Sequence, residues 1–388
     1  MSSKIQPSLT QLFSSFLRLG LTAFGGPSMI AYIRAMAVDK KRWLDSETFI
    51  DGVALSQMIP GATAMQTAAY VGLKTRGVAG ASVSYIGFGL PAFLMMMMFS
   101  LLYSYSGNLP LVVSAFSGLQ AIIVAIIANA TLSFGKTTLI NWKTMVIASI
   151  AAGLFGLNTN PILVILLAGM AGFLLIRPKE PSTSQPISFL QAFPYKKAIL
   201  LMLSLSATGF LLLFLFNKTL FSLAALMFRI DLFAFGGGFA SVPLMLHEIV
   251  GIHHWMDAQT FMNGIVLGQV TPGPIVITAT FVGYLLGGPL GGIIATMAIF
   301  LPSFMLLIGI SPYFDRIRNS PTFTKFIGGV LCSFVGLLLT VTIRFALNVH
   351  WDFFHLLLGS SSFVALLLKV DILWVVVAGT IISVIMFI

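Results

Sequence analysis

The stretch RLGLTAFGG at residues 18–26 returns as RIDLFAFGG at residues 229–237, which is 211 residues further along the chain. The match continues downstream, where QMIPG at 57–61 is answered by QVTPG at 269–273. Similarity held at a nearly fixed distance indicates an internal repeat. The sequence therefore predicts two homologous halves, residues 1–176 and 219–388, joined by a linker and a connecting membrane helix in residues 177–218.

The composition around these repeats belongs to a membrane protein. Of the 388 residues, 58% are hydrophobic and only 8% are charged, whereas an average soluble domain carries about 25% charged residues. Apolar runs of roughly twenty residues recur along the chain, and each is long enough to cross a ~30 Å hydrocarbon core as a helix. The net charge of +10 comes from Lys and Arg between these runs, a pattern that sets membrane topology and argues against nucleic acid binding.

The expected fold class is all-α, a polytopic integral membrane protein of about thirteen transmembrane helices. An odd number of apolar segments separates the starts of the two halves, so the halves are predicted to be inverted-topology repeats with broken helices, a common build of secondary transporters. The first segment is interpreted as an uncleaved span, and the excess of Lys and Arg on the N-terminal side predicts a cytoplasmic N-terminus in the cell membrane. The spans are expected at 12–36, 48–72, 78–103, 109–133, 143–157, 161–176, 196–216, 219–246, 259–286, 288–311, 324–345, 353–368 and 372–388. The short pairs 143–157/161–176 and 353–368/372–388 leave re-entrant hairpins open as an alternative.

Each half contains two helix-breaking sites within its apolar segments. They are Gly25-Gly26-Pro27 and Pro60-Gly61 in the first half, and Gly236-Gly237-Gly238 and Thr271-Pro272-Gly273-Pro274 in the second. A helix that restarts after such a break points unpaired N–H groups and a positive dipole end toward a cavity, which suits an anion. The alternative is that these residues are kinks and close-packing points, which membrane helices also use.

Polar side chains near the breaks are candidates for the same anion site. Arg18 and Arg229 stand in apolar runs before the glycine pairs, where a charge indicates function or a buried partner, although Arg18 could also reach the membrane surface. Asp231 is a candidate partner or proton site for Arg229. Gln57 and Gln269 come one helical turn before the Pro-Gly breaks, where they could contact an oxyanion or another helix. Thr63, Thr271 and Thr278 are weaker candidates of this kind.

The cluster of His247, Glu248, His253, His254 and Asp257 could suggest a metal site, but HEIVG lacks the second histidine of the HExxH zinc motif. The cluster is therefore predicted to be a polar loop. Glu248 remains a candidate for proton coupling. The single cysteine, Cys332, excludes a disulfide framework. We therefore expect no metal and no cofactor. Without an ATP-binding P-loop motif or a nucleophile and base within the spans, we also do not expect an enzyme.

With these motifs in view, the sequence resembles the chromate ion transporter family in its form with two fused halves. The resemblance rests on LTAFGGP (21–27), RWLDSETF (42–49), ALSQMIPGATAMQTAAYVG (54–72), GLPAF (89–93), FAFGGGFASVPLM (233–245), GQVTPGPIVITATFVG (268–283) and FLPSF (300–304). It implies a transporter that exports chromate with the proton motive force and so gives chromate resistance. Sulfate, the dianion that chromate mimics, is a further expected substrate.

The prediction is therefore a secondary active transporter of a tetrahedral oxyanion. Its expected partners are the anion and the lipid bilayer, and a homodimer is left open. A sulfate or other anion carrier and a passive anion channel are the alternatives. The substrate-binding residues are predicted to be Arg18, Phe24, Gly25, Gly26, Pro27, Gln57, Pro60, Gly61, Thr63, Arg229, Gly236, Gly237, Gly238, Gln269, Thr271, Pro272, Gly273 and Pro274, with Asp231 and Glu248 as proton-coupling candidates.

Overall fold

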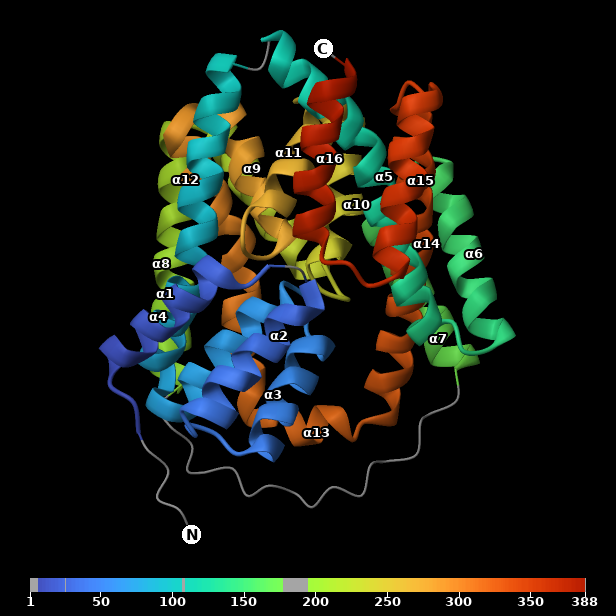
Figure 1. The fold of residues 1–388 in the computed structure, drawn as a ribbon. Helices are drawn as coiled ribbons and strands as arrows, with labels where there is room; N and C mark the ends of the chain where they lie inside the picture. The colour runs from blue at the N-terminus through green and yellow to red at the C-terminus, as the bar shows by residue number, and fades with distance from the viewer. Residues whose placement is uncertain (1–5, 25, 107–108, 177–194, 388) are drawn as a thin grey trace. The chain divides into compact units, whose positions relative to one another are not determined.

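The computed structural model describes residues 6–24, 26–106, 109–176 and 195–387. Every regular element in these ranges is a helix (Figure 1), so the predicted all-α class is confirmed. The helices form two compact units, which are described separately below. The predicted linker 177–194 and Gly25 lie outside the described residues.

Unit 1 contains residues 1–97, 181–238 and 271–319. Its elements from the first half are α1 (Leu9–Thr22), α2 (Gly26–Arg34), the π-helix η1 (Ala35–Lys40), α3 (Ser46–Met58) and most of α4 (Thr63–Ser106). Its later elements are α8 (Tyr195–Phe216), α9 (Lys218–Phe233), η4 (Ile275–Ile277), α12 (Thr278–Ile310), η5 (Ser311–Tyr313) and α13 (Phe314–Arg318).

Unit 2 contains residues 98–180, 239–270 and 320–388. From the first half it takes α5 (Pro110–Thr138), α6 (Trp142–Gly156) and α7 (Pro161–Leu175). From the second half it takes α10 (Ser241–Met245), the π-helix η3 (Leu246–Ile252), α11 (Ala258–Val270), α14 (Pro321–Asn348), α15 (Phe353–Leu367) and α16 (Ile372–Phe387), while η2 (Gly238–Ala240) lies at the boundary. Each unit is therefore built from both halves of the sequence repeat.

Helix α4 turns back on itself at Gly77, which has a positive φ of 62° that glycine adopts readily. Gly72 and Gly80 lie against each other across this turn, so that a Cβ on either residue would meet the backbone of the other. Helix α12 repeats the turn at Gly288, where φ is 60°. The predicted ends of spans at 72/78 and 286/288 coincide with these turns.

The helices also stop at the predicted breaks. Helix α1 ends at Thr22 before α2, and α3 ends at Met58 before α4. In the second half, α9 ends at Phe233 before η2, and α11 ends at Val270 before η4. The predicted spans 12–36, 48–72, 219–246 and 259–286 are therefore each made of shorter helical pieces, because Gly and Pro interrupt the backbone ladder.

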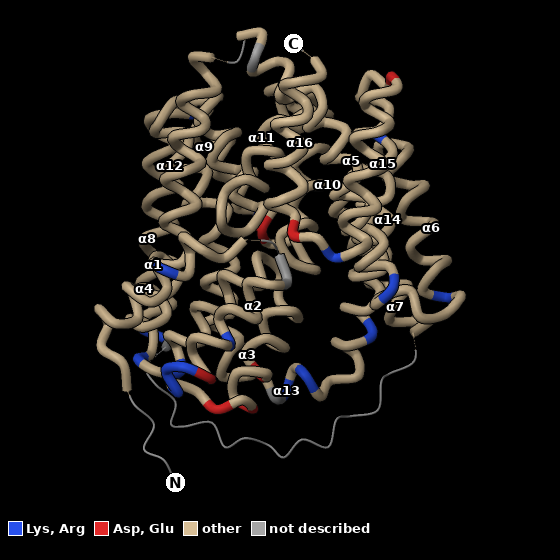
Figure 2. The backbone as a smooth tube through the Cα atoms, viewed as in Figure 1, with Lys and Arg blue, Asp and Glu red and all other residues tan. Residues whose placement is uncertain are grey.

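Five stretches of helix in the described residues are long and apolar enough to cross a membrane. They are Thr63–Ser106, Val112–Thr138, Lys196–Phe216, Ile275–Tyr313 and Pro321–Asn348. Five further apolar helices are shorter, including all four helices of the pairs for which re-entrant hairpins were left open. Figure 2 shows long uncharged lengths along α5, α12 and α14, as expected of a polytopic membrane protein. The count of thirteen spans stays a prediction.

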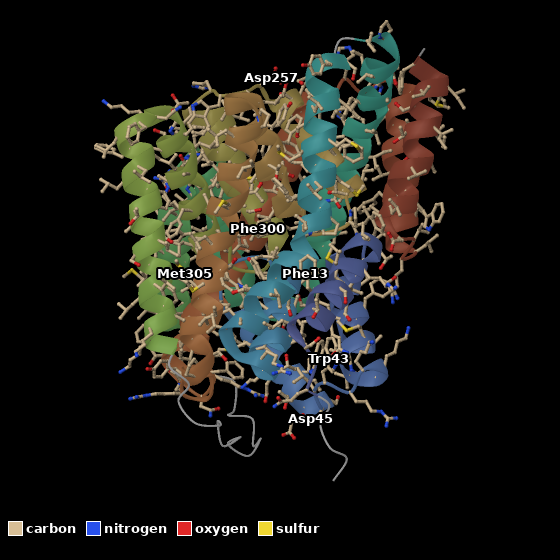
Figure 3. The ribbon with its side chains drawn as sticks, turned by 90° about the vertical axis from the view of Figure 1, so that its left-hand side faces the viewer. Phe13, Trp43, Asp45, Asp257, Phe300 and Met305 are labelled. Atoms are coloured by element: carbon tan, nitrogen blue, oxygen red, sulfur yellow. The ribbon has the colours of Figure 1, made fainter. Side chains whose placement is uncertain are left out.

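Fine details of the backbone recur in both halves. The side chain of Asp45 accepts a hydrogen bond from the N–H of Thr48 at 2.8 Å, and Asp257 accepts one from Thr260 at 2.6 Å. Both carboxylates cap the start of the next helix, α3 or α11. Arg42 and His254, just upstream, have positive φ values of 52° and 50°. Figure 3 labels Asp45 beside Trp43 in the turn before α3.

In unit 2, Thr131 of α5 and Thr342 of α14 contact each other directly, with 3.3 Å between their hydroxyl oxygens. These two residues are separated by 211 positions, the distance of the sequence repeat. The same pair of helices also meets at Gly135 and Val335. Residue numbers therefore rise along one helix as they fall along the other, so α5 and α14 run antiparallel.

Candidate transport site

Three of the four helix breaks meet inside unit 1. The N–H of Gly61, between α3 and α4, donates a hydrogen bond to the carbonyl oxygen of Ala234, after α9, at 3.0 Å. A Cβ on Gly237 would lie 3.2 Å from Thr63 Oγ1, and one on Gly238 would lie 3.2 Å from side-chain atoms of Ile275 and Val276 in η4. The packing thus joins breaks that stand far apart in the sequence.

Gly61 has no room for a side chain. Its φ of +112° lies in the region that glycine tolerates best. A Cβ there would run into Ser303 Cβ and would lie 2.9 Å from Ser303 Oγ and 3.1 Å from Asp231 Oδ1. The glycine therefore lets the break approach a buried carboxyl group on α9 and a hydroxyl group on α12.

Asp231 is the acidic side chain at this junction, and it is only 1% exposed. Its Oδ2 accepts a 2.7 Å hydrogen bond from the backbone N–H of Ser303. Ser303 follows Pro302 within α12, where the proline removes a backbone hydrogen bond and loosens the helix. Oδ1 of Asp231 has no hydrogen-bond partner in the described structure. An ionised carboxylate held in this way is costly, since a buried charge needs both a counter-charge and full hydrogen bonding.

Tyr85 of α4 extends the polar contacts across to α12. Its hydroxyl donates to the carbonyl oxygen of Phe300 at 2.9 Å and lies 3.1 Å from Ser303 Oγ. Its ring packs edge-on against Phe300, which is labelled in Figure 3, and tilted against Phe304. Tyr85 and Ser303 are almost completely buried, so these contacts fix α12 beside its proline.

Gln66 of α4 closes the other side of the same break. Its Nε2 donates a 2.6 Å hydrogen bond to the carbonyl oxygen of Pro60, and its side chain is fully buried. Its Oε1 is buried without a hydrogen-bond partner among the described residues. At the Pro60-Gly61 break the Gly61 N–H is therefore already used, and the free buried groups are oxygen acceptors on Gln66 and Asp231.

The two predicted arginines do not point into this interior. Arg18 on α1 and Arg229 on α9 are both exposed at the surface of their helices. Asp231 lies two residues after Arg229, and side chains at that spacing do not share a helix face. The described contact of the Asp231 carboxylate is with the N–H of Ser303, and its pairing with Arg229 stays a prediction.

The remaining predicted residues fall into three groups. Gln57 is exposed on α3, whereas Gln269 is half-buried on α11 in unit 2 with no partner for its Nε2 in the part of the chain that is described. Phe24 is half-buried at the end of α1, and Gly26 and Pro27 begin α2. The buried residues around the breaks are Pro60, Gly61, Thr271, Pro272, Gly273 and Pro274, and the half-buried ones are Thr63, Gly236, Gly237 and Gly238.

The sequence predicted that Glu248 lies in a polar loop, and this prediction is wrong. Glu248 belongs to the π-helix η3 of unit 2, where it and His247 are buried. The ring Nδ1 of His253 lies 3.0 Å from the Glu248 carbonyl oxygen and 3.7 Å from its carboxylate. The apolar residues around these polar ones continue the helix, so a run of His and Glu was a poor signal for a loop. No grouping of His, Cys, Asp and Glu suited to a metal occurs among the described residues.

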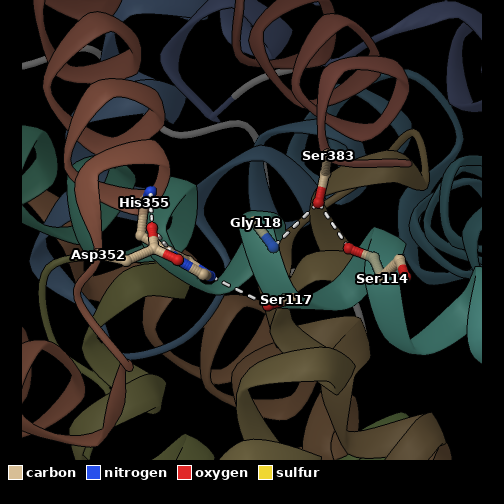
Figure 4. Close-up of polar contacts among 6 residues, drawn as sticks. All are labelled: Ser114, Ser117, Gly118, Asp352, His355 and Ser383. Atoms are coloured by element: carbon tan, nitrogen blue, oxygen red, sulfur yellow. Dashed lines mark hydrogen bonds and ion pairs between the residues drawn. The ribbon is translucent and has the colours of Figure 1, made fainter. Parts of the chain in front are cut away.

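Sequence reasoning missed a polar cluster in unit 2, shown in Figure 4. The ring of His355 bridges Asp352 Oδ1, 2.8 Å from Nδ1, and Ser117 Oγ, 3.0 Å from Nε2. Nearby, Ser383 Oγ accepts from the N–H of Gly118 at 3.0 Å and donates to the carbonyl oxygen of Ser114 at 2.6 Å. This hydroxyl from α16 thus bridges one turn of the α5 backbone. Residues from three separate helices form the cluster, so no local pattern could reveal it.

Comparison with known proteins identifies the family. The family model described as "Chromate transporter" matches residues 10–173 and again residues 221–384. The chain belongs to the chromate transporter family. The two matched regions correspond to the two halves of the repeat, and the protein is accordingly a transporter rather than an enzyme.

The curated relatives agree over most of their length. An uncharacterised transporter of Methanocaldococcus jannaschii is 44% identical over 99% of this chain and 96% of its own. Chromate transport proteins of Cupriavidus metallidurans and Pseudomonas aeruginosa are each 30% identical, over 93% and 92% of this chain and 88% and 86% of theirs. No solved structure matches this chain.

The missed residues of unit 1 stand inside the family motifs. Gln66 belongs to ALSQMIPGATAMQTAAYVG and Ser303 to FLPSF, two of the stretches on which the resemblance to the family rests, and both lie within the matched ranges. Ser303 directly follows Pro302, and Gln66 lies six residues after Pro60, so a polar residue close to a helix-breaking proline was the available signal. What the motifs could not show is that Gln66 and Ser303 flank the same glycine, Gly61.

Proposed function

We propose that this protein is a secondary active transporter that exports chromate, with the proton motive force as its energy source. The family and its chromate transport relatives support the cargo. The observation that carries the proposal is the junction of broken helices in unit 1, where Gly61 bonds to Ala234 beside the buried Asp231. Broken helices around a buried ionisable group are the build that coupled transporters use.

Inverted repeats are part of this proposal, and contacts within both units support them. In unit 2, α5 and α14 occupy equivalent places in the two halves and run antiparallel through Thr131 and Thr342. In unit 1, the second arms of α4 and α12 are also equivalent, and Tyr85 meets Phe300 while Met97 meets Gly292. These contacts likewise require opposite directions. Contact between equivalent residues is what a two-fold relation between copies produces.

The binding residues are proposed as the sequence predicted them. Gln269 has the strongest support, because a buried amide N–H group without a partner is a ready donor to an oxyanion. The N–H groups of the breaks, apart from that of Gly61, which bonds to Ala234, complete the proposed set together with Arg18, Arg229 and Gln57. Asp231 or Glu248 is the proposed proton site. The cytoplasmic N-terminus, the cell membrane location and a homodimer belong to the same proposal.

The test is chromate and sulfate flux in proteoliposomes, with a pH gradient and a membrane potential imposed separately and protein-free liposomes as the control. We expect chromate movement that follows the pH gradient and is reduced by sulfate. Chromate flux that ignores both gradients would instead indicate a passive anion channel. Flux of sulfate without chromate would make the protein a sulfate carrier. Movement of neither anion by well-inserted protein would refute the proposed cargo.

The contribution of Gln269 is tested in the same assay. Gln269→Leu should lower chromate flux by at least tenfold, because the apolar side chain removes the unpartnered amide donor. Gln120→Leu is the matched control. Gln120 lies on α5, and its side-chain amide donates a 3.2 Å hydrogen bond to Asn263 on α11, the helix that carries Gln269. Equal losses in both variants would mean that Gln269 only supports the packing of α11.

A further inference from the structure

Among the buried ionisable groups of unit 1, Asp231 stands at a place where its charge can control the backbone. It lies in the last turn of α9, and its own carbonyl oxygen accepts the N–H of Ala234 at 3.2 Å. The carbonyl oxygen of Ala234 in turn accepts the N–H of Gly61 at 3.0 Å. The residue that carries the carboxyl group and the residue that accepts the Gly61 bond are thus three positions apart, joined by one backbone hydrogen bond at the end of α9.

The carboxyl group is held from one side only. Oδ2 accepts the Ser303 N–H beside Pro302, whereas Oδ1 faces Gly61 without a hydrogen-bond partner in the described residues. A proton on Oδ1 would remove the buried charge and supply a donor at that position. The loss of that proton restores a charge that the interior stabilises poorly and that Gly61 must lie against.

The surroundings offer little else to neutralise this charge. The titratable side chain packed toward this cluster from α4 is Tyr85, which contacts Ser303. Helix α12 presents Ser303 and the α3–α4 connection presents Gly61, neither of which titrates. Arg229, on the same helix as Asp231, is exposed. Within the described structure, the charge on Asp231 is therefore most readily balanced by a bound proton.

We propose that Asp231, rather than Glu248, binds the coupling proton, that Ser303 and Tyr85 position its carboxyl group, and that its protonation controls the Gly61–Ala234 bond between the broken helices. This assignment rests on the proposed proton-coupled transport and adds the residue and the backbone contact through which coupling works. The two halves are unequal here, since Gly20 and Ala92 occupy the places of Asp231 and Ser303 in the first half. The proposed proton site therefore occurs in the second half and not at the equivalent place of the first.

The first test detects the proton without any cargo. Infrared difference spectra of the purified full-length protein in lipid nanodiscs, recorded across pH, should show a carboxylic acid band that titrates. The band should vanish in Asp231→Asn and persist in Asp51→Asn, the control, because Asp51 pairs with Arg318 at 2.9 Å in the same unit. A titrating band that survives in Asp231→Asn would overturn the assignment.

The second test measures coupling in proteoliposomes. Asp231→Asn should keep the flux of labelled chromate down its own gradient, but the flux driven by a pH gradient should fall at least tenfold. The control Asp51→Asn should keep the pH-driven flux. Loss of the pH-driven flux in Glu248→Gln, with Asp231→Asn unaffected, would overturn the assignment. Wild-type response in Asp231→Asn would overturn the assignment and leave the proposed function standing. A wild type that moves chromate but ignores the pH gradient would refute proton coupling itself.

The role of Tyr85 needs its own readout, because it acts through Ser303. Tyr85→Phe should move the pH midpoint of the infrared band and of chromate flux while leaving maximal exchange within about twofold. Tyr32→Phe is the control, since Tyr32 is 46% exposed on α2. An unchanged pH midpoint in Tyr85→Phe would show that Tyr85 contributes packing only and does not position the carboxyl group of Asp231.

Discussion

The contact of α1 with α4 in the first half is equivalent to the contact of α9 with α12 in the second. The first depends on close backbone packing, whereas the second depends on a side-chain hydrogen bond. Gly20 lets α1 lie directly on the carbonyl oxygen of Phe88, so this contact is backbone against backbone. At the equivalent place in the second half, the carboxyl group of Asp231 reaches the Ser303 N–H. Both helices carry a proline here, Pro91 in α4 and Pro302 in α12.

This difference teaches that a repeated fold need not repeat its chemistry. Unit 2 shows the same division. Asn141 and Thr144 form a neutral capping box at the start of α6, whereas Asp352 and His355 stand at the equivalent positions of α15. In both units, the first half keeps an uncharged contact where the second half places a titratable one.

Placing the aspartate of the second half at the equivalent glycine of the first half should have the largest effect on stability. Gly20→Asp places a side chain against the Phe88 carbonyl oxygen and adds a buried charge without a donor. Overpacking and an unpaired buried charge together should cost more than about 4 kcal/mol of stability. We expect little folded protein, measured by size-exclusion chromatography in detergent.

The control for this exchange is Ser14→Ala, on the exposed face of the same helix, which adds no charge and should fold normally. A Gly20→Asp protein as stable as the control would show that the first half accepts a carboxyl group at this position. The two halves would then differ here in sequence but not in what their packing allows.

Gly61→Ala should have the next largest effect, because it disturbs the packing of Gly61 against Ser303 and Asp231. The new Cβ would overlap Ser303 at a φ of +112°. Overpacking of this kind and the positive φ should together cost about 2–4 kcal/mol, seen as a lower melting temperature in detergent, and chromate flux should be lost.

Gly77→Ala separates the two causes. Gly77 also has a positive φ, of 62°, but a Cβ there would meet nothing within 4 Å. At its ψ of −152° the backbone lies in a region that is almost restricted to glycine, so this variant should lose about 1–3 kcal/mol from backbone strain alone and keep its flux. Equal losses at Gly61 and Gly77 would show that backbone strain, and not contact with Ser303 and Asp231, makes Gly61 necessary.

Substitutions at Thr131 and Thr342 test whether the two halves are symmetric at a contact between equivalent residues. Each hydroxyl group bonds a carbonyl oxygen in its own helix as well, at 2.8 Å and 2.9 Å. Thr131→Val and Thr342→Val should therefore have similar, small effects, with a coupling of roughly 0.6 kcal/mol in a double-mutant cycle. Markedly unequal effects would argue against a two-fold relation at this contact.

Asp352 should give the smallest effect, visible as a pH dependence. The backbone N–H of His355, and then its ring, hold the pKa of Asp352 below its usual range. A lowered folded pKa stabilises the protein above the unfolded value near about 3.9, and this stabilisation is lost as pH falls through the folded pKa. The stability of wild type over Asp352→Asn, measured by chemical unfolding, should therefore shrink on acidification. A difference independent of pH would show that the amide caps α15 as well as the carboxylate does.

The sequence by itself determined the helical membrane fold, the repeat and the positions of the breaks. These depend on local causes: apolar length, helix-breaking Gly and Pro, and residues repeated at a fixed distance. The turns at Gly77 and Gly288 and the caps at Asp45 and Asp257 follow from the same local signals.

The tertiary structure alone decided which of these breaks meet and what lies between them. From sequence alone, Arg229 was a candidate partner of Asp231 because it is a near neighbour, but a helix places residues two apart on different faces. The tertiary packing brings the N–H of Ser303 to the Asp231 carboxylate. Gly61, Ala234 and Ser303 come from three distant segments, and their contact depends on the close packing that glycine permits. A sequence shows where a backbone can break, whereas the partner of a broken segment depends on packing between helices that are remote along the chain.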